Sequence, residues 1–453
     1  MKELLRSAVV PLYVLLCLVL GGSAQGIWSN AALQLLAVAI IAWSAVVKPF
    51  GPLTGAAKVL FVLVGLVVSM LCLQLVPLPP SVWLALPGRG FLAHGYALLG
   101  QAPPWLPISL TPYETMGTGL TLLPPIAVLS AMLLRGAYRE SWLTLAILIG
   151  TLAAVLVGAL QVGSADPFTS PWYFYEITNH GAATGFFANR NHMASLLVIS
   201  VPILFALVED LRSRVENPKA KSATLLLAFA GGLVLLVGIL LNGSLAVLLL
   251  GPPVLVLSAS MLMPPQMKLR RLLTGLALLA MVATLAVYIS PLHDQMADTN
   301  ATSVTERKTI WSNTTPAVLA FMPVGSGISS FVDLYAGYEN PLEVTRTYVN
   351  HAHNDYLEIA LETGIPGIVL LIVFLLWWGI RTRYLWRSQR TNRYALAASI
   401  ATAALLLHSL VDYPLRTAAL SAIMAACLAL MVQPRDGTKD AKDDLWRTRH
   451  LTV

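Results

Sequence analysis

Charged residues are scarce in this sequence of 453 residues. Asp, Glu, Lys and Arg together make up 11% of it, and hydrophobic residues make up 57%, whereas a soluble globular domain carries about 25% charged residues. So few charged side chains cannot cover the surface of a soluble fold of this length. The composition therefore predicts an all-α integral membrane protein.

Cysteines and repeats are also scarce. The three cysteines, Cys17, Cys72 and Cys427, all fall within apolar stretches, so neither a disulfide framework nor a zinc site is expected. No internal repeat or low-complexity linker divides the chain, which we interpret as a single polytopic membrane domain over 1–453. No cofactor is expected.

Apolar runs of about 20 residues, separated by charged or proline-rich breaks, indicate helices that cross a bilayer, because each helix pairs its own backbone polar groups. The sequence holds about twelve such runs. Their expected limits are 8–24, 31–47, 59–77, 116–134, 141–162, 192–208, 223–241, 244–262, 272–290, 364–380, 395–411 and 417–433.

Lysine and arginine are distributed unevenly between the two sides that these runs define. With the amino terminus in the cytoplasm, 23 of the 29 fall in cytoplasmic segments, which is the bias expected for the inner side of a membrane. The segment 434–453 is then a cytoplasmic tail, and the basic excess gives no indication of a nucleic-acid partner. The start of the chain also fits a cleaved signal peptide, which would leave about eleven spans.

Three segments on the outer side are long: 78–115, 163–191 and 291–363. The first is rich in Pro and Trp, which is typical of an interfacial cover that rests on the bilayer surface. The third is the large outer loop, in which we expect short helices. Connections of that length usually carry function.

The end of the large loop carries a dense polar stretch, "NHAHNDYLEIALETGIPG" at 350–367. Asn354 suits the cap of a short helix, and Gly364 and Pro366 predict that this helix breaks and restarts. His353 then lies at a helix amino terminus, whose partial positive charge favours a neutral imidazole that can accept a proton. A plain cap-and-turn, in which His353 only satisfies a backbone group, explains the same pattern.

Arginine dominates the outer cations. Its planar fork matches phosphate oxygens in two-point contacts, so Arg190, Arg307 and, more weakly, Arg346 are candidates for binding phosphate. An anchor at the membrane surface is the alternative for each of them. Arg416 and Asp412 are expected to pair with each other across their turn.

Several polar neighbours have two interpretations. Asn191 and His192 either contact a substrate or cap the sixth span, and His351 either orients an acceptor or faces solvent. Three carboxylates share one helix face: Asp355, Glu358 and Glu362. That face suits a Mg²⁺ ion held with phosphate oxygens, but we favour a solvated surface and expect no metal.

The motif at 353–367 resembles that of the O-antigen ligases and of the related O-antigen polymerases and protein O-oligosaccharyltransferases. It consists of His353 and Asn354, nine further residues, and then Gly364 and Gly367. The stretches "RKTIWSNTTPAVLAFMPVGSGISSF" and "ATGFFANRNHMASLL" are similar to two other segments of that family. The likeness covers roughly 160–415.

The resemblance implies a membrane glycosyltransferase fold of the C type, with the large loop and the active site on the periplasmic face of the bacterial inner membrane. It implies transfer of a glycan from an undecaprenyl diphosphate carrier by an inverting reaction that needs no metal. His353 would take the proton of the acceptor hydroxyl. The other implied residues are Arg190, Arg307 and Arg346 for the diphosphate, Asn354, His351 and Asn191 as support, and Gly364 and Gly367 as structural glycines.

The motif leaves the acceptor open. A ligase joins the glycan to lipid A core, a polymerase to another lipid-linked repeat unit, and a protein O-oligosaccharyltransferase to a Ser or Thr hydroxyl. The nine-residue spacing and the basic tail favour a ligase, with an O-antigen or exopolysaccharide polymerase as the alternative. A transporter is disfavoured, because carriers of charged solutes place ionisable residues near the middle of the membrane, where these runs have almost none.

Overall fold

The computed structural model describes residues 2–24, 27–261, 293–342, 344, 349–388 and 392–433. Within these ranges the chain is helical and contains no strand, apart from one isolated bridge between Leu78 and Leu106. The helices are α1 (Lys2–Leu20), α2 (Trp28–Val46), α3 (Gly55–Gln74), α4 (Pro80–Trp83), α5 (Gly90–Leu98), α6 (Pro112–Thr121), α7 (Leu123–Arg135), α8 (Glu140–Val162), α9 (Arg190–Arg214), α10 (Pro218–Asn242), α11 (Leu245–Ser260), α13 (His293–Phe321), α14 (Phe331–Tyr335), α15 (Asp355–Arg387), α16 (Arg393–His408), the 3₁₀ helix η1 (Pro414–Arg416) and α17 (Ala418–Val432).

Eight described stretches are long and apolar enough to cross a membrane: α1, α2, α3, α6 with α7, α8, α9, α10 and α15. Three further helices, α11, α16 and α17, are apolar but shorter. Each of these coincides with one of the predicted runs, and the run predicted at 272–290 lies outside the described residues. The prediction of an all-α membrane protein is confirmed, while the number of twelve spans stays a prediction.

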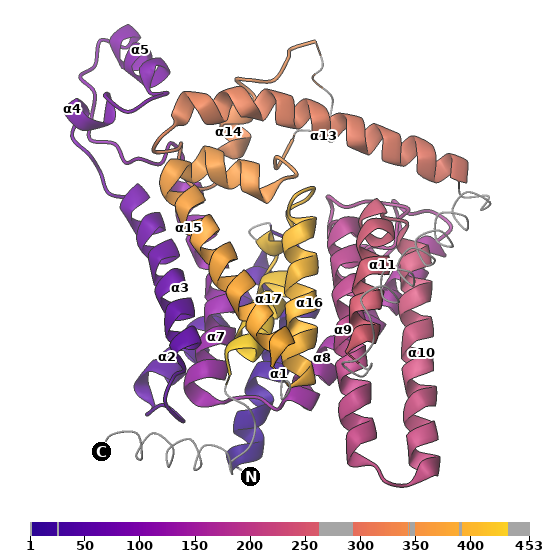
Figure 1. Ribbon diagram of the computed structural model, residues 1–453. Coiled ribbons are helices and arrows are strands. Elements are labelled where there is room, and N and C mark those ends of the chain that lie inside the picture. The colour runs from indigo at the N-terminus through magenta and orange to yellow at the C-terminus, as the bar shows by residue number, and fades with distance from the viewer. Residues whose placement is uncertain are drawn as a thin grey trace, which may run out of the picture.

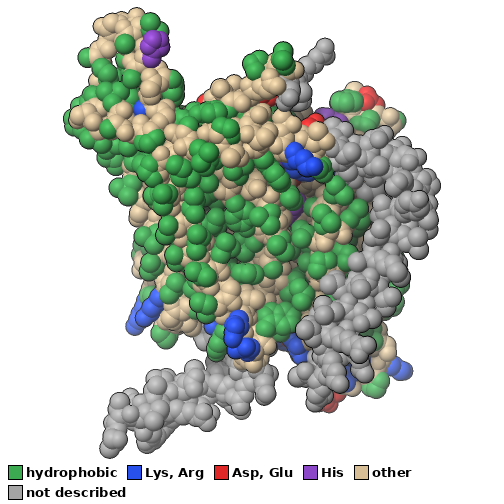
Figure 2. Space-filling view, turned by 45° about the horizontal axis from the view of Figure 1, so that its top comes forward, with side chains coloured by type: hydrophobic (Ala, Val, Ile, Leu, Met, Phe, Trp, Pro, Cys, Tyr) green, Lys and Arg blue, Asp and Glu red, His purple; other side chains and the backbone are tan. Residues whose placement is uncertain are grey.

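Helices rich in small residues hold the centre of the bundle. In α17 every residue from Ala422 to Val432 is buried. α16 packs against α9 and α17, and α17 packs against α7. Alanine lets helix backbones approach closely, and such packing drives association where the surrounding lipid is as apolar as the helices. Larger apolar side chains cover the outer surface, as the green band in Figure 2 shows.

A second layer covers one end of the bundle (Figure 1). α13, with 29 residues, lies across this end beside α14 and the first turns of α15. The large loop therefore contains one long helix, where only short helices were expected. α4 and α5 stand above the upper end of α3, and the interfacial role of this segment stays a prediction.

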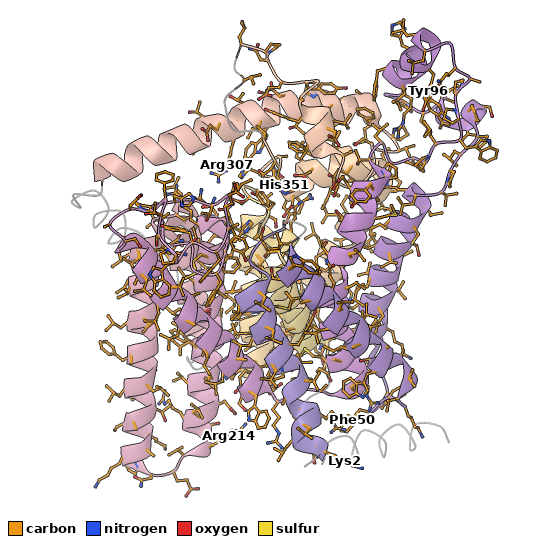
Figure 3. All side chains as sticks on the ribbon, turned by 180° about the vertical axis from the view of Figure 1, so that it is seen from behind. Lys2, Phe50, Tyr96, Arg214, Arg307 and His351 are labelled. Atoms are coloured by element: carbon orange, nitrogen blue, oxygen red, sulfur yellow. The ribbon has the colours of Figure 1, made fainter. Side chains whose placement is uncertain are left out.

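The two ends of the bundle differ in what they carry. Figure 3 shows Lys2 and Arg214 at the end where α1 begins and where α9 turns into α10. Arg307 and His351 lie at the opposite end, just above the spanning helices. The polar residues that the sequence singled out thus gather at the end that α13 covers.

Candidate active site

Four segments far apart in the sequence meet at this end of the bundle. They are the start of α9, the stretch of α13 around Arg307, the loop before α15, and the turn between α16 and η1. The turn supplies Asp412, whose side chain is fully buried. Each of the other three segments directs a polar side chain toward this carboxylate. Asp412 is therefore the centre of the candidate site.

The two oxygens of Asp412 have different partners. Oδ2 accepts a hydrogen bond from Asn191 Nδ2 at 2.6 Å and pairs with Arg307 Nη2 at 3.2 Å. Oδ1 lies 3.6 Å from His353 Nδ1 and 3.8 Å from His192 Nε2. The histidine and one of the arginines that the sequence singled out therefore face opposite oxygens of one carboxylate.

Asp412 keeps its negative charge although it is buried. Burial raises the pKa of Asp412, but interaction with His353, His192 and His408 outweighs burial and holds this pKa well below its usual range. The side chain is therefore a carboxylate at neutral pH. It can stabilise a positive charge that develops on a neighbouring imidazole.

His353 combines a strained backbone with a partly open side chain. Its φ of 49° lies in the left-handed region, which for a residue other than glycine costs about 1–3 kcal/mol and recurs at functional sites. The next residue anchors it: Asn354 Oδ1 accepts hydrogen bonds from the backbone N–H groups of Tyr356 and Leu357, both at 3.1 Å. This confirms the predicted helix cap. The side chain is 23% exposed, so a ring whose Nδ1 faces Asp412 still reaches the outside.

Tyr413 packs the histidines together. Its hydroxyl accepts hydrogen bonds from Asn350 Nδ2 at 3.1 Å and from Asn189 Nδ2 at 3.5 Å. Burial raises the pKa of Tyr413 to about 12, so the phenol stays neutral. The ring lies against three imidazoles, with centroid distances of 4.1 Å to His351, 5.0 Å to His192 and 5.0 Å to His353.

Arg190 begins α9 and lies close enough to Arg307 for their positive charges to act on each other. Its backbone is fixed on both sides, since its N–H donates to Asn179 Oδ1 at 2.9 Å and its carbonyl accepts from Asn242 Nδ2 at 2.8 Å. Two guanidinium groups held near each other raise the local concentration of anions. Arg346, the third candidate, lies outside the described residues.

Gly364 changes the direction of α15. Its φ of +59° and ψ of −149° kink α15, as predicted for this position. The loop after α13 fills the kink, because Ile365 N–H donates to the Pro323 carbonyl at 2.8 Å. A Cβ at Gly364 would lie 2.2 Å from that carbonyl oxygen, and a Cβ at Gly367 would lie 1.7 Å from Thr363 Oγ1. Both glycines are therefore required by close approach.

Arg416 faces α15. Its Nε lies 3.1 Å from Asp355 Oδ1, and its Nη2 lies 3.1 Å from Glu358 Oε1 and 3.9 Å from Glu362 Oε2. The expected pair of Arg416 with Asp412 is therefore wrong, since each has other partners. The expected solvated face is wrong too: the three carboxylates are only 8%, 1% and 2% exposed, and Arg416 of η1 contacts all three.

His351 points inward rather than to solvent. Its Nδ1 lies 2.9 Å from Glu358 Oε1. Burial lowers the pKa of His351 despite the opposing influence of Glu358. His351 is therefore a neutral ring in the wall of the site.

Asp412 and Tyr413 are the candidates that sequence reasoning missed. The signal was present in "HSLVDYPLRT", a polar turn between two apolar runs on the same side as the large loop. Pairing within that turn is the simplest interpretation of its charges. Only the fold shows that the turn contacts α9, α13 and the loop before α15.

Comparison with known proteins agrees with the motif. Residues 230–372 match the family described as O-antigen ligase, a range that includes Arg307 and the motif from His353 to Gly367. The resemblance is confirmed for this segment. No curated protein matches the chain. Among the residues that the structure describes, no group of three or more His, Cys, Asp or Glu side chains is arranged to hold a metal ion.

Proposed function

Because residues 230–372 match the O-antigen ligase family, we propose that this protein moves a glycan from an undecaprenyl diphosphate carrier to an acceptor sugar, with ligation of O-antigen to lipid A core as the reaction. The family supports glycosyl transfer of the ligase or polymerase type by a membrane enzyme. The donor, the acceptor and the roles of individual residues are our proposal.

The observation that carries the proposal is the carboxylate that His353 and Arg307 share. Glycosyl transfer from a diphosphate needs a base for the acceptor proton and cations for the leaving group, in one place. Asp412 lies 3.6 Å from His353 and 3.2 Å from Arg307. The two chemical functions are therefore next to each other at the end of the bundle.

In the proposed reaction the acceptor oxygen attacks the anomeric carbon while the bond from that carbon to the diphosphate oxygen breaks. The hydroxyl proton passes to Nε2 of His353, because Nδ1 faces Asp412, and the electron pair of the broken bond leaves with undecaprenyl diphosphate. Attack opposite the leaving group inverts the anomeric configuration. A positioned base of this kind contributes about 10²–10⁴-fold to the rate.

We assign the leaving group to Arg190 and Arg307, with Arg346 as a third contact. Fixed positive groups stabilise the charge that develops on the diphosphate, and they do so best where water is partly excluded. A guanidinium has five N–H donors, so the contact of Arg307 with Asp412 is compatible with a second contact to a phosphate oxygen. Asn191 supports this arrangement by its hydrogen bond to the same carboxylate.

We place the site on the periplasmic face of the bacterial inner membrane, where the lipid-linked donor and the acceptor would meet. The distribution of cations supports this orientation, since Lys2 and Arg214 lie at the end away from the site (Figure 3). A polymerase that joins lipid-linked repeat units is the alternative, and a protein O-oligosaccharyltransferase is a more distant one. All of them would use the same base and the same leaving-group site.

An acceptor assay tests the reaction. Purified protein receives undecaprenyl diphosphate-linked glycan with lipid A core, and in a second reaction the linked glycan alone. Ligation in the first without chain growth in the second supports the ligase. Chain growth in the second reaction identifies a polymerase instead.

His353→Ala tests the base. We expect transfer to fall by at least about 10²-fold while the variant inserts into the membrane and elutes from a sizing column as the wild type does. Wild-type turnover of this variant would refute the mechanism, whichever acceptor is used.

A further inference from the structure

Three buried carboxylates and one partly exposed arginine lie on the two segments that carry the proposed base and Asp412. They form what we call the Arg416 cluster: Arg416, Asp355, Glu358 and Glu362. Buried charges are tolerated only where they are paired and hydrogen-bonded, and Glu358 meets this condition most completely. Its Oε1 pairs with Arg416 and His351, and its Oε2 accepts a hydrogen bond from the backbone N–H of Ala352 at 2.9 Å.

The Arg416 cluster holds both sides of the contact between His353 and Asp412. On one side, Glu358 binds the two residues directly before His353. On the other side, Arg416 belongs to the short connection that carries Asp412. The ion pair of Glu358 with Arg416, at 3.1 Å, therefore joins the segment of the base to the segment of its carboxylate.

A second link lies beside this ion pair. The backbone N–H of Asp355 donates to the carbonyl of Ser409 at 2.9 Å, and the side chain of Asp355 reaches Arg416 Nε at 3.1 Å. The loop before α15 and the segment between α16 and α17 are thus joined through both backbone and side chain. A change in one of them moves the other.

The contact between His353 and Asp412 needs such support. At 3.6 Å it is longer than a hydrogen bond, and the buried His353 Nδ1 has no hydrogen-bond partner in the described part of the chain. The left-handed φ of His353 is also a conformation that the surroundings must impose. The charged and titratable groups around this imidazole are Asp412, His192, His351 and Tyr413, and Arg307 pairs with the other oxygen of Asp412.

We propose that Glu358 and Arg416 are positioning residues that hold His353 Nδ1 toward Asp412, so that Nε2 faces the acceptor. This inference rests on the proposed function, because it assumes that His353 is the base. Glu358 acts through Ala352 and His351, and Arg416 acts through the turn of Asp412. Neither contacts the substrate in this scheme.

Steady-state kinetics of Glu358→Gln and Arg416→Lys test the proposal. We expect kcat to fall about 10–100-fold, as for other residues that orient a catalytic group, while KM for the lipid-linked donor stays within about twofold. Asp210→Asn is the matched control, since it removes a carboxylate paired with Arg214 at 2.8 Å at the other end of the molecule.

A double-mutant cycle separates positioning from general stability. If Glu358 acts through the His353–Asp412 contact, Glu358→Gln combined with Asp412→Asn is no slower than Asp412→Asn alone. Multiplicative losses, or a raised KM with normal kcat, would overturn the inference. Should Glu358→Gln not fold, Glu358→Asp replaces it in both measurements, with the same criteria.

The positioning role of Glu358 and the role of His353 as the base can be refuted independently. An active His353→Ala variant would refute the base itself. An inactive His353→Ala variant beside a fully active Glu358→Gln variant would refute only the positioning role.

Discussion

At the scale of single residues, one carboxylate arranges the chemistry of the site. Because Asp412 faces His353 Nδ1 on one oxygen and Arg307 on the other, it couples the proposed base to the proposed leaving-group site. Donor binding that draws on Arg307 would therefore also alter the field at the imidazole. Side chains with the same charge but another shape should not substitute at these positions.

The first prediction concerns the shape of the Arg307 side chain. Arg307→Lys keeps the charge but loses the planar fork that matches phosphate oxygens, so we expect kcat/KM for the lipid-linked donor to fall about 10–100-fold. The neighbouring Lys308 is exposed, and Lys308→Ala should change this value less than about twofold. An unchanged kcat/KM in Arg307→Lys would mean that only the positive charge at this position matters.

The second prediction concerns stability and pH. An unfolded chain protonates His351 near pH 6.5, whereas burial lowers the pKa of His351 in the folded protein. The stability linked to this ring is therefore complete above about pH 6.5 and is lost as pH falls through the folded value. Between pH 7 and pH 5, the thermal midpoint of the wild type should fall more than that of His351→Gln; parallel curves would contradict this.

How much of the site the sequence predicts depends on whether an interaction is local. The cap by Asn354 and the kink at Gly364 are set by a few neighbouring residues, and both are observed. The partners of Asp412 come from segments more than fifty residues away, and no local pattern specifies them. The burial of Glu358 likewise depends on η1 packing against α15.

At the scale of elements, the kink in α15 joins the site to the rest of the outer layer. Gln74 at the end of α3 donates from Nε2 to the Glu362 carbonyl at 2.9 Å, and its Oε1 accepts from the N–H of Ile328 at 2.9 Å. The loop after α13, the kink and α3 are thus bonded to one another. The apolar helices can be predicted from their composition. The length of α13 cannot, because this helix lies across the bundle and lacks a membrane-spanning pattern.

The third prediction tests the kink. Gly364→Ala forces a side chain into a left-handed backbone and to within 2.2 Å of the Pro323 oxygen, so we expect a loss of about 2–4 kcal/mol in stability, together with a loss of transfer activity. Gly379 lies in the same helix, and a Cβ added there would meet nothing within 4 Å. Gly379→Ala should leave the thermal midpoint unchanged or higher. A normal midpoint for Gly364→Ala would show that the loop can move aside.

At the scale of the whole molecule, the bundle separates its two ends by charge and by structure. The end with α13 carries the ion pairs of Arg307 and Arg416, and the other end carries exposed cations such as Arg214 (Figure 3). This division is what the uneven distribution of Lys and Arg in the sequence predicts. It also predicts which residues face which compartment.

The fourth prediction concerns this orientation. In a variant without native cysteines, Asp166→Cys and Glu339→Cys should react with a membrane-impermeant thiol reagent added to the periplasmic side. Lys48→Cys and Lys219→Cys should react only after the membrane is opened, because they lie on the predicted cytoplasmic side. Labelling in the reverse pattern would place the site in the cytoplasm and exclude a periplasmic reaction.

The residues of the site are far apart along the chain, so the site can form only late in biosynthesis. A nascent chain emerges from the ribosome amino end first, so Arg190, Arg307 and His353 are made before Asp412 and Arg416. Until the connection between α16 and α17 has been translated and inserted, His353 lacks the carboxylate of Asp412. A premature stop after residue 372 and before that connection should therefore yield an inert polypeptide, even though the whole segment that matches the family, 230–372, has already been synthesised.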